Sequence, residues 1–213
     1  MDALRFLSEL ATPSGQFQPV GVGCPSRSLP FGLPFTSDPR GVLAVGTIEP
    51  RKNIDGLLDA WEALPAELRA EFDLVLAGPM GWASAATQER VRKARYLGYV
   101  AEADIAPLTA AAAVAACPSL YEGFGFPVAQ AMAAGTPVIT SSVSALPEIS
   151  GGAALLMDPL SEMSLRDAME EILTSPSRRE KSIELGRANA RRFTWEECAR
   201  KSLQFFEEVV GRA

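Results

Sequence analysis

The stretch from residue 41 to residue 64 decides the fold, because an apolar run, a turn and an amphipathic segment follow one another there. The run is Val42-Leu43-Ala44-Val45, and the turn is Gly46-Thr47-Ile48-Glu49-Pro50-Arg51-Lys52-Asn53. A strand that is apolar at consecutive positions is buried on both faces, which is typical of a parallel sheet covered by helices. The segment after the turn has apolar residues at the i, i+3, i+4, i+7 spacing of a one-sided helix: Ile54, Leu57, Leu58, Trp61 and Leu64. The stretch therefore predicts one strand–helix unit of a parallel α/β fold.

The same alternation continues along the chain. Further apolar runs occupy residues 74–77, 114–117, 138–139 and 154–157. Residues 165–173 repeat the helical spacing, and Thr194-Trp195-Glu196-Glu197 is a capping box that opens a final helix. The apolar stripe of that helix includes Leu203, Phe206 and Val210. Strands that alternate with helices predict a doubly wound, Rossmann-like parallel sheet for residues 41–213.

Residues 1–40 have a different composition. Six of the 16 prolines lie between Pro13 and Pro39, and proline removes backbone hydrogen-bond donors and fixes φ. We expect a short helix over residues 2–10, a short strand over residues 16–23, and otherwise a Pro/Gly-rich linker. The predicted organisation is thus an N-terminal helix and linker (1–40) followed by one Rossmann-like domain (41–213).

The composition excludes several classes of function. The 213 residues are 47% apolar and 22% charged, with a net charge of −6. This balance suits a globular protein and disfavours nucleic-acid binding, which normally needs a basic face. No apolar run approaches the roughly 18 residues of a membrane-spanning helix. Histidine is absent, which excludes a Ser-His-Asp or Cys-His nucleophile and the commonest metal ligand.

Metal and disulfide chemistry also lack the usual residues. No Asp-x-Asp pair offers an obvious seat for magnesium. The three cysteines, Cys24, Cys117 and Cys198, are far apart and match neither a disulfide framework nor a zinc site. We expect a reduced, cytoplasmic protein that uses no metal and no cofactor.

Two adjacent cations follow the first apolar run, where ligands of such a sheet bind beyond the carboxyl ends of the strands. Arg51 and Lys52 stand just before a helix that Asn53 can cap. A helix N-terminus with two cations beside it is a phosphate site. No lysine or arginine occurs from Tyr96 to Leu165, so this pair supplies the main cations of the crevice. The alternative is that both are ordinary surface charges.

A second candidate is the loop Glu122-Gly123-Phe124-Gly125, which follows the run that ends at Cys117. Glycines at a strand-to-helix turn let a ligand approach the backbone, whose free amides attract anions. Glu122 is the only acidic residue between Asp104 and Glu148. The alternatives are an ordinary glycine turn and an exposed turn carboxylate.

These motifs resemble glycosyltransferase family 4, in the same order and spacing from about Gly41 to Val210. The matching segments are residues 45–53, 118–128, 131–139, 146–148 and 152–159. The signature Glu49-Pro50-Arg51-Lys52-Asn53 most resembles that of bacterial mannosyltransferase-like members. The resemblance implies a GT-B fold, in which two Rossmann-like domains face each other across a cleft, and it identifies this chain with the C-terminal, donor-binding half.

The resemblance also implies roles for single residues. Arg51 and Lys52 match the cations that hold the donor diphosphate. Glu122 matches the first carboxylate of the family's Glu-x7-Glu motif, near the donor sugar. The amides of Gly123, Phe124 and Gly125 match those that reach the sugar and phosphate, and Tyr99 and Val100 match the segment beside the nucleobase. The second acid of the motif is replaced by Gln130, whose amide oxygen still accepts a hydrogen bond but carries no charge.

The function that follows is the donor-binding half of a retaining, metal-independent hexosyl glycosyltransferase. The resemblance implies transfer of a hexose, such as mannose from GDP-mannose, to a glycan or glycolipid acceptor in polysaccharide biosynthesis. Its expected partners are a nucleotide diphosphate sugar and an N-terminal acceptor domain or separate acceptor subunit, with no nucleic acid. The inner face of the membrane is the alternative to a free cytoplasmic location.

Three other functions are weighed against this one. A non-catalytic relative that binds nucleotide sugar or a partner protein is favoured by Gln130 and by the absence of an acceptor domain. A nucleotide-sugar epimerase on the same fold also needs two domains. A dinucleotide oxidoreductase is disfavoured, because Gly21-Val22-Gly23 lacks the third glycine of the fingerprint and lies in the proline-rich linker.

Overall fold

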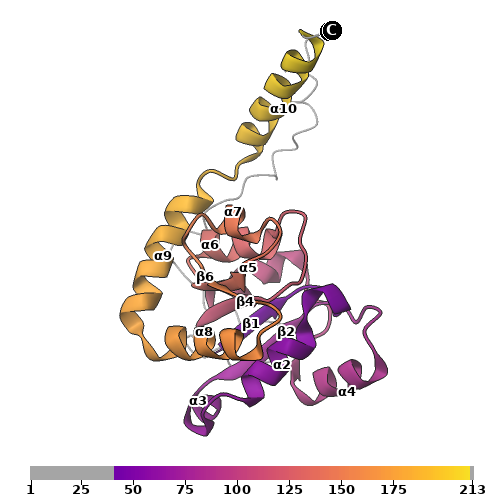
Figure 1. The fold of residues 1–213 in the computed structure, drawn as a ribbon, viewed down its shortest axis with the longest axis vertical. Helices are drawn as coiled ribbons and strands as arrows, with labels where there is room; N and C mark the ends of the chain where they lie inside the picture. The colour runs from indigo at the N-terminus through magenta and orange to yellow at the C-terminus, as the bar shows by residue number, and fades with distance from the viewer. Residues whose placement is uncertain (1–40, 212–213) are drawn as a thin grey trace.

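The computed structural model describes residues 41–211. The helix, linker and strand expected within residues 1–40 lie outside the described residues. Figure 1 shows the described chain as a layered α/β body from which one helix extends.

The centre of the body is a parallel sheet in the order β3-β2-β1-β4-β5-β6, six strands within residues 41–211. This order is that of the doubly wound Rossmann fold, so the predicted fold class is confirmed. Leu43 of β1 lies in register with Val75 of β2 on one side and Ala115 of β4 on the other. The strands are β1 (Gly41–Val45), β2 (Asp73–Ala77), β3 (Arg95–Tyr96), β4 (Val114–Cys117), β5 (Val138–Ser141) and β6 (Leu155–Met157).

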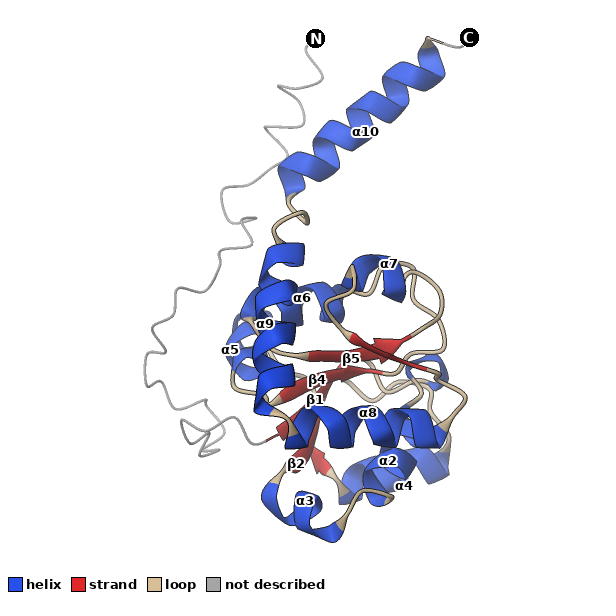
Figure 2. Cartoon of the chain, turned by 60° about the vertical axis from the view of Figure 1, so that its left-hand side comes forward, coloured by secondary structure: helices blue, strands red, loops and turns tan. Residues whose placement is uncertain are grey.

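Helices cover both faces of this sheet, as Figure 2 shows. On one face, α2, α4 and α8 pack against Val42, Ala44 and Leu76. On the other face, α5 packs against Leu43 and Val75, and α6 and α7 pack around the β4 and β5 strands. The helices are α2 (Ile54–Glu62), α3 (Ala66–Glu71), α4 (Ala85–Lys93), α5 (Glu102–Ala110), α6 (Phe126–Ala134), α7 (Leu146–Ser150), α8 (Glu162–Thr174), α9 (Pro176–Ala190) and α10 (Trp195–Val210), with the short 3-10 helix η1 (Pro50–Lys52) before α2.

The last helix, α10, differs from its neighbours because none of its residues is buried. In Figure 1 it runs away from the sheet. Its start agrees with the prediction, since the Thr194 side chain accepts a hydrogen bond from the Glu197 amide at 3.1 Å. The reciprocal half of the capping box is not made, because the Glu197 carboxylate pairs with Arg200 and Lys201 instead. The predicted apolar stripe is present, and no residue of the described chain buries it, since Phe206 is 62% exposed.

Candidate functional site

The loops that follow β1 and β2 run side by side beyond the sheet and form the floor of the candidate site. The Gly46 amide donates to Ala77 O at 2.8 Å, and Ile48 forms a parallel bridge with Met80. Glycine is required at position 78, where φ is +142°, because a Cβ there would overlap the carbonyl group of Gly46. The close approach of these two loops fixes the backbone that leads into η1.

Arg51 and Lys52 end η1, directly before α2. Asn53 occupies the N-cap position of α2 but does not cap it with its side chain, so this prediction was wrong. The reason is its left-handed backbone, with φ 54° and ψ 43°, whereas a capping side chain normally comes from an extended residue. The side-chain amide of Asn53, through Nδ2, instead donates to Pro159 O at 2.9 Å and links η1 to the loop after β6.

Glu122 brings the two cations together. Its Oε1 atom lies 2.5 Å from Lys52 Nζ, and its Oε2 atom lies 2.9 Å from Arg51 Nη1. The Ser119 hydroxyl donates to Oε1 at 2.9 Å. The residue is only 7% exposed, so the alternative of an exposed turn carboxylate is wrong. A backbone hydrogen bond from Leu120 N to Arg51 O, 2.7 Å long, joins the two loops as well.

The charged residues of this cluster shift one another's pKa values. Burial would raise the pKa of Glu122, but the hydrogen bonds from Lys52, Ser119 and Arg51 and the charge of Lys52 outweigh it and lower that pKa. Burial would likewise lower the pKa of Arg51, but Glu122 and Glu49 outweigh it and raise that pKa. Glu122 is therefore a carboxylate at neutral pH and is not a source of protons.

Arg51 is also paired with a second buried carboxylate. Glu49, which is 5% exposed, places Oε1 2.5 Å from Arg51 Nε. Arg51 Nη1 donates to Glu122 and to Tyr121 O. Among residues 41–211, Nη2 has no hydrogen-bond partner, and 44% of the side chain is exposed. The guanidinium is thus held by Nε and Nη1 and leaves Nη2 free for an anion.

The loop after β4 contributes backbone donors. The amides of Gly123, Phe124 and Gly125 donate no hydrogen bond to any residue between 41 and 211. These residues precede α6. Its N-cap residue, Gly125, has φ +96°, and a Cβ added there would lie only 2.7 Å from the Leu146 side chain. The Phe124 ring packs against Phe126 and Phe193. Three unpaired amides at a helix N-terminus attract an anion.

Two further predicted residues lie on the loop after β3. Tyr99 is 72% exposed, while Val100 packs against the cluster around Leu43 and Val75. The loop is tied to the one after β2, because the Gly78 amide donates to Gly98 O at 2.7 Å. The role of Tyr99 and Val100 beside a nucleobase stays a prediction.

Gln130 lies in α6, apart from the Glu122 cluster. It lines a cavity of about 10 Å³ with residues of β1, β4 and α5, among them Val45, Thr109 and Cys117. A cavity of this size holds about one water molecule. No side-chain hydrogen bond of Gln130 is formed with any residue between 41 and 211.

The structure therefore brings Arg51, Lys52 and Glu122 into direct contact. Tyr99 lies on the loop after β3, and Gln130 lies within α6. Sequence reasoning missed three supporting residues: Glu49, Ser119 and Ser144, whose Oγ accepts from the Glu122 amide at 3.1 Å. Glu49 stands within the quoted signature, two residues before Arg51, but its role is recognised only from the burial of its side chain in the structure. Ser144 has a left-handed backbone with φ 55°. A serine in the sequence gives no sign of this conformation.

Comparison with known proteins identifies the family. The model of the family described as glycosyl transferases group 1 matches residues 39–175. The chain belongs to this family. It is 40% identical over 171 residues to O-antigen chain mannosyltransferase B of Escherichia coli, covering 78% of this chain and 45% of that protein. It is 28% identical over 180 residues to the serotype-specific mannosyltransferase WbdA of Escherichia coli, covering 79% of this chain and 22% of that protein.

Solved structures agree on the fold of this glycosyltransferase chain. Sucrose-phosphate synthase from Thermosynechococcus elongatus matches with a TM-score of 0.69 and 28% identity, over 85% of this chain and 47% of that one. WaaG, a glycosyltransferase involved in lipopolysaccharide biosynthesis, matches with a TM-score of 0.67 and 23% identity over 79% of this chain and 47% of that one, which bears on the fold alone. These neighbours are GT-B enzymes. The chain spans less than half the length of the proteins it matches.

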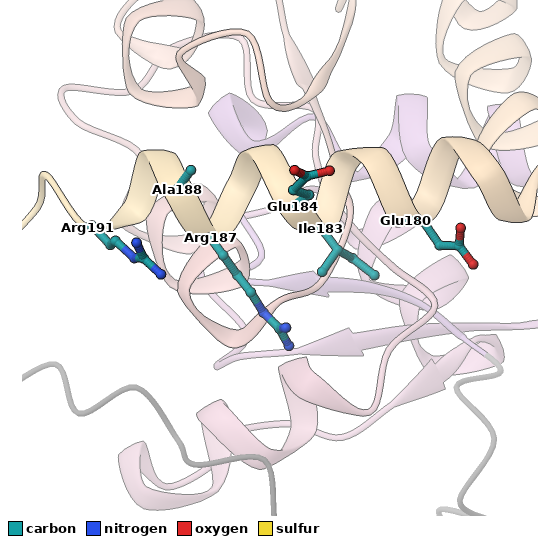
Figure 3. A pocket seen from close by; sticks show the side chains of 6 residues that line it. All are labelled: Glu180, Ile183, Glu184, Arg187, Ala188 and Arg191. Atoms are coloured by element: carbon teal, nitrogen blue, oxygen red, sulfur yellow. The ribbon is translucent and has the colours of Figure 1, made fainter.

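A separate hollow lies along α9 (Figure 3). All six lining side chains that the structure describes come from this one helix: Glu180, Ile183, Glu184, Arg187, Ala188 and Arg191. Arg187 lies against Gly135, which ends α6, where a cation complements the helix dipole. We assign Arg187 to helix-end charge.

Between residues 41 and 211, no helix is both long enough and apolar enough to cross a bilayer. In the same part, no three or more Cys, Asp or Glu side chains are grouped so that they could hold a metal ion.

Proposed function

We propose that this chain is the donor-binding half of a retaining, metal-independent hexosyltransferase, which acts on a nucleotide diphosphate sugar. The observation that carries the proposal is the contact of Arg51 and Lys52 with Glu122, directly before three amides that have no hydrogen-bond partner within residues 41–211. These groups suit a diphosphate, because it needs several cationic and N–H donors around its oxygens.

In this reaction the leaving group, the diphosphate, needs the most stabilisation. When the bond between sugar and diphosphate breaks, negative charge grows on the diphosphate. Donors already aimed at that charge stabilise the transition state without reorganising. Each charge-assisted contact contributes about 1.5–3 kcal/mol, or roughly 10- to 150-fold. In our proposal Arg51 Nη2 and Lys52 supply this stabilisation in place of a metal ion.

Glu122 has a different role in this scheme. Because its pKa is lowered, it stays ionised and holds the two cations beside each other. Without it, Arg51 and Lys52 would repel each other across a partly buried space. In our proposal it lies near the donor sugar, and Tyr99 and Val100 lie beside the nucleobase.

The names of the relatives support mannose as the sugar and a glycan or glycolipid as the acceptor. We propose a GDP-mannose donor and a role in polysaccharide biosynthesis. The acceptor is then bound by an N-terminal domain or a separate subunit, because the chain spans less than half of its relatives. We propose a cytoplasmic location, with the acceptor reached at the inner face of the membrane.

Gln130 favours a second candidate function, a non-catalytic protein that binds a nucleotide sugar. An amide at this position can accept a hydrogen bond from a ribose hydroxyl but offers it no negative charge. Donor binding would then be weaker, and transfer would be lost while recognition remained. This candidate differs from the first in catalysis and not in the site.

Calorimetric titration tests the proposal. The purified chain is titrated with GDP, UDP and ADP and with their sugar conjugates. We expect one nucleotide to bind and a double variant, R51A/K52A, to bind it at least about 100-fold more weakly, since two charge-assisted contacts are lost. The matched control is R92A/K93A, which removes an exposed Arg-Lys pair from α4. No binding of any nucleotide at millimolar concentration, or equal losses in both double variants, contradicts the proposal.

A further inference from the structure

We propose that Glu49 is a positioning residue, which holds the Arg51 guanidinium in the orientation that presents Nη2 to the donor diphosphate. This inference rests on the proposed function of the site. It concerns a residue whose side chain lies below the surface and makes its ion pair with Arg51.

The first support is the burial of a charge. Glu49 is 5% exposed, and among residues 41–211 its Oε1 atom has no partner other than Arg51. A buried carboxylate is costly unless a cation offsets it. The ion pair to Arg51 Nε, 2.5 Å long, is the contact that does so.

The second support is the geometry of the guanidinium. A guanidinium is a rigid planar fork, so fixing two of its three nitrogens fixes the third. Glu49 fixes Nε, and Glu122 with Tyr121 O fixes Nη1. If the contact at Nε were lost, the group could rotate about its remaining contacts, and Nη2 would no longer point in one direction.

The third support is the position of Glu49 in the chain. It is the residue before η1, with an extended backbone of φ −147° and ψ 156°. The bridge between Ile48 and Met80 and the hydrogen bond from Gly81 N to Ile48 O hold the residue next to it. Glu49 therefore comes from a fixed backbone, whereas the Arg51 side chain that it holds is partly exposed.

Two opposite outcomes separate positioning from simple neutralisation of charge. If Glu49 were only a counter-charge, E49Q would make the site more positive and would bind a diphosphate more tightly. The E49D variant, which keeps the charge, would then bind like the native chain. If Glu49 positions Arg51, both variants bind more weakly, because E49Q removes the ion pair and E49D is one methylene too short to reach Nε.

In the experiment, GDP, UDP and ADP are titrated into the native chain and into five variants. These are E49Q, E49D, R51A and the double variants E49Q/R51A and E49D/R51A. We expect about a 10-fold weaker Kd for E49Q and for E49D in the native background, and no change when Arg51 is already alanine. The control E71Q makes the same charge change at the exposed end of α3, which leads into the amino end of β2. Its Kd should equal that of the native chain. Tighter binding by E49Q, or an equal effect of E49Q with and without Arg51, overturns the inference.

A second measurement needs no nucleotide. We expect the Arg51 Nε–H of the native chain to give a resolved, slowly exchanging NMR signal, assigned by its loss in R51A. This signal should collapse into the average arginine signal in E49Q and persist in E71Q. An unchanged signal in E49Q overturns the inference. If the native chain binds no nucleotide, the proposed function fails, while this signal still decides whether Glu49 holds Arg51.

Discussion

At the scale of single residues, the site is a balance of four charges within a small space. Glu49 and Glu122 are buried, and Arg51 and Lys52 pair with them. Breaking a buried ion pair by removing one partner leaves an uncompensated charge and is strongly destabilising. The carboxylates therefore affect the stability of the fold as well as the binding of a ligand.

Replacing Glu122 by glutamine should lower the free energy of unfolding by about 2 kcal/mol. The value is below that of a fully buried pair because Arg51 is 44% exposed and is partly solvated once its partner is removed. Urea unfolding at pH 7 measures the change. E71Q, which alters an exposed carboxylate on α3, should unfold like the native chain.

This difference should also depend on pH. The pKa of Glu122 is lowered in the folded state from an ordinary value of 4.5, so the stability that it contributes is fully present above that ordinary value. That contribution is lost as the pH falls through the lower folded pKa. The gap between native and E122Q unfolding free energies should therefore be constant from pH 8 to pH 6 and should shrink below about pH 4.5. A gap that grows in acid would mean that Glu122 is not held as a carboxylate.

Sequence reasoning at this scale found the charged residues but not their contacts. Arg51, Lys52 and Glu122 were named from their place after strands, yet their pairing joins residues about 70 positions apart. The predicted cap by Asn53 failed because residue type does not reveal a left-handed φ. Glu49 was missed because an acidic residue in a turn is normally exposed.

At the scale of elements, the loops after β1 and β2 form a rigid base for η1. Their contact depends on Gly78, which has φ +142° and faces the Gly46 carbonyl. A side chain at this point would have to push the two loops apart, and the ladder that continues from the sheet to Met80 would be disturbed.

The variant G78A should lose about 3 kcal/mol of stability, from backbone strain and from overlap with Gly46. It should also bind nucleotide more weakly, because η1 shifts with the loop. Thermal unfolding and calorimetry measure the two effects. The matched control is G152A, where φ is +79° and no atom lies within 4 Å of the added Cβ; only the strain of about 1 kcal/mol is expected there. Equal losses in both variants would show that contact with Gly46 is not important.

Helices α8 and α10 illustrate what periodicity predicts. Both have the apolar spacing expected from the sequence, but α8 buries its stripe, from Leu165 to Leu173, and α10 buries nothing. Periodicity indicates that a helix has an apolar face and does not indicate what covers that face. The two-residue strand β3 shows a related limit, since Arg95 and Tyr96 pair with β2 without forming an apolar run.

A chain shortened after Phe193, and so without α10, should keep its free energy of unfolding within about 0.5 kcal/mol. The reason is that α10 contributes no buried residue. Guanidinium unfolding of the two chains tests this. As a check on sensitivity, N189A in α9 should lose about 1–2 kcal/mol, because Asn189 donates to Ile149 O and Ser150 O. A large loss on shortening would mean that α10 stabilises the body.

At the scale of the whole molecule, the strand order explains why the candidate site forms where it does. β1 and β4 are neighbours in the sheet although two other strands lie between them in the chain. The order of strands reverses at this pair, and crevices for ligands lie outside the carboxyl ends at such a point. The pattern of strands and helices predicts this place. The side-chain distances within it depend on the packing of loops, which residue types alone do not specify.

The last prediction concerns the activity of the chain by itself. Residues 41–211 form a single sheet with its covering helices, and the chain spans less than half of its relatives. A transfer reaction needs the acceptor hydroxyl held against the donor carbon, and this positioning accounts for a large share of catalysis. We therefore expect the purified chain to bind its nucleotide sugar and to transfer no sugar to added mannose oligosaccharides, as followed by mass spectrometry. Nucleotide binding without transfer would separate the donor site from acceptor positioning, and adding the acceptor half should then restore transfer in the native chain but not in R51A/K52A. Sugar transfer by the chain alone would contradict this division of roles.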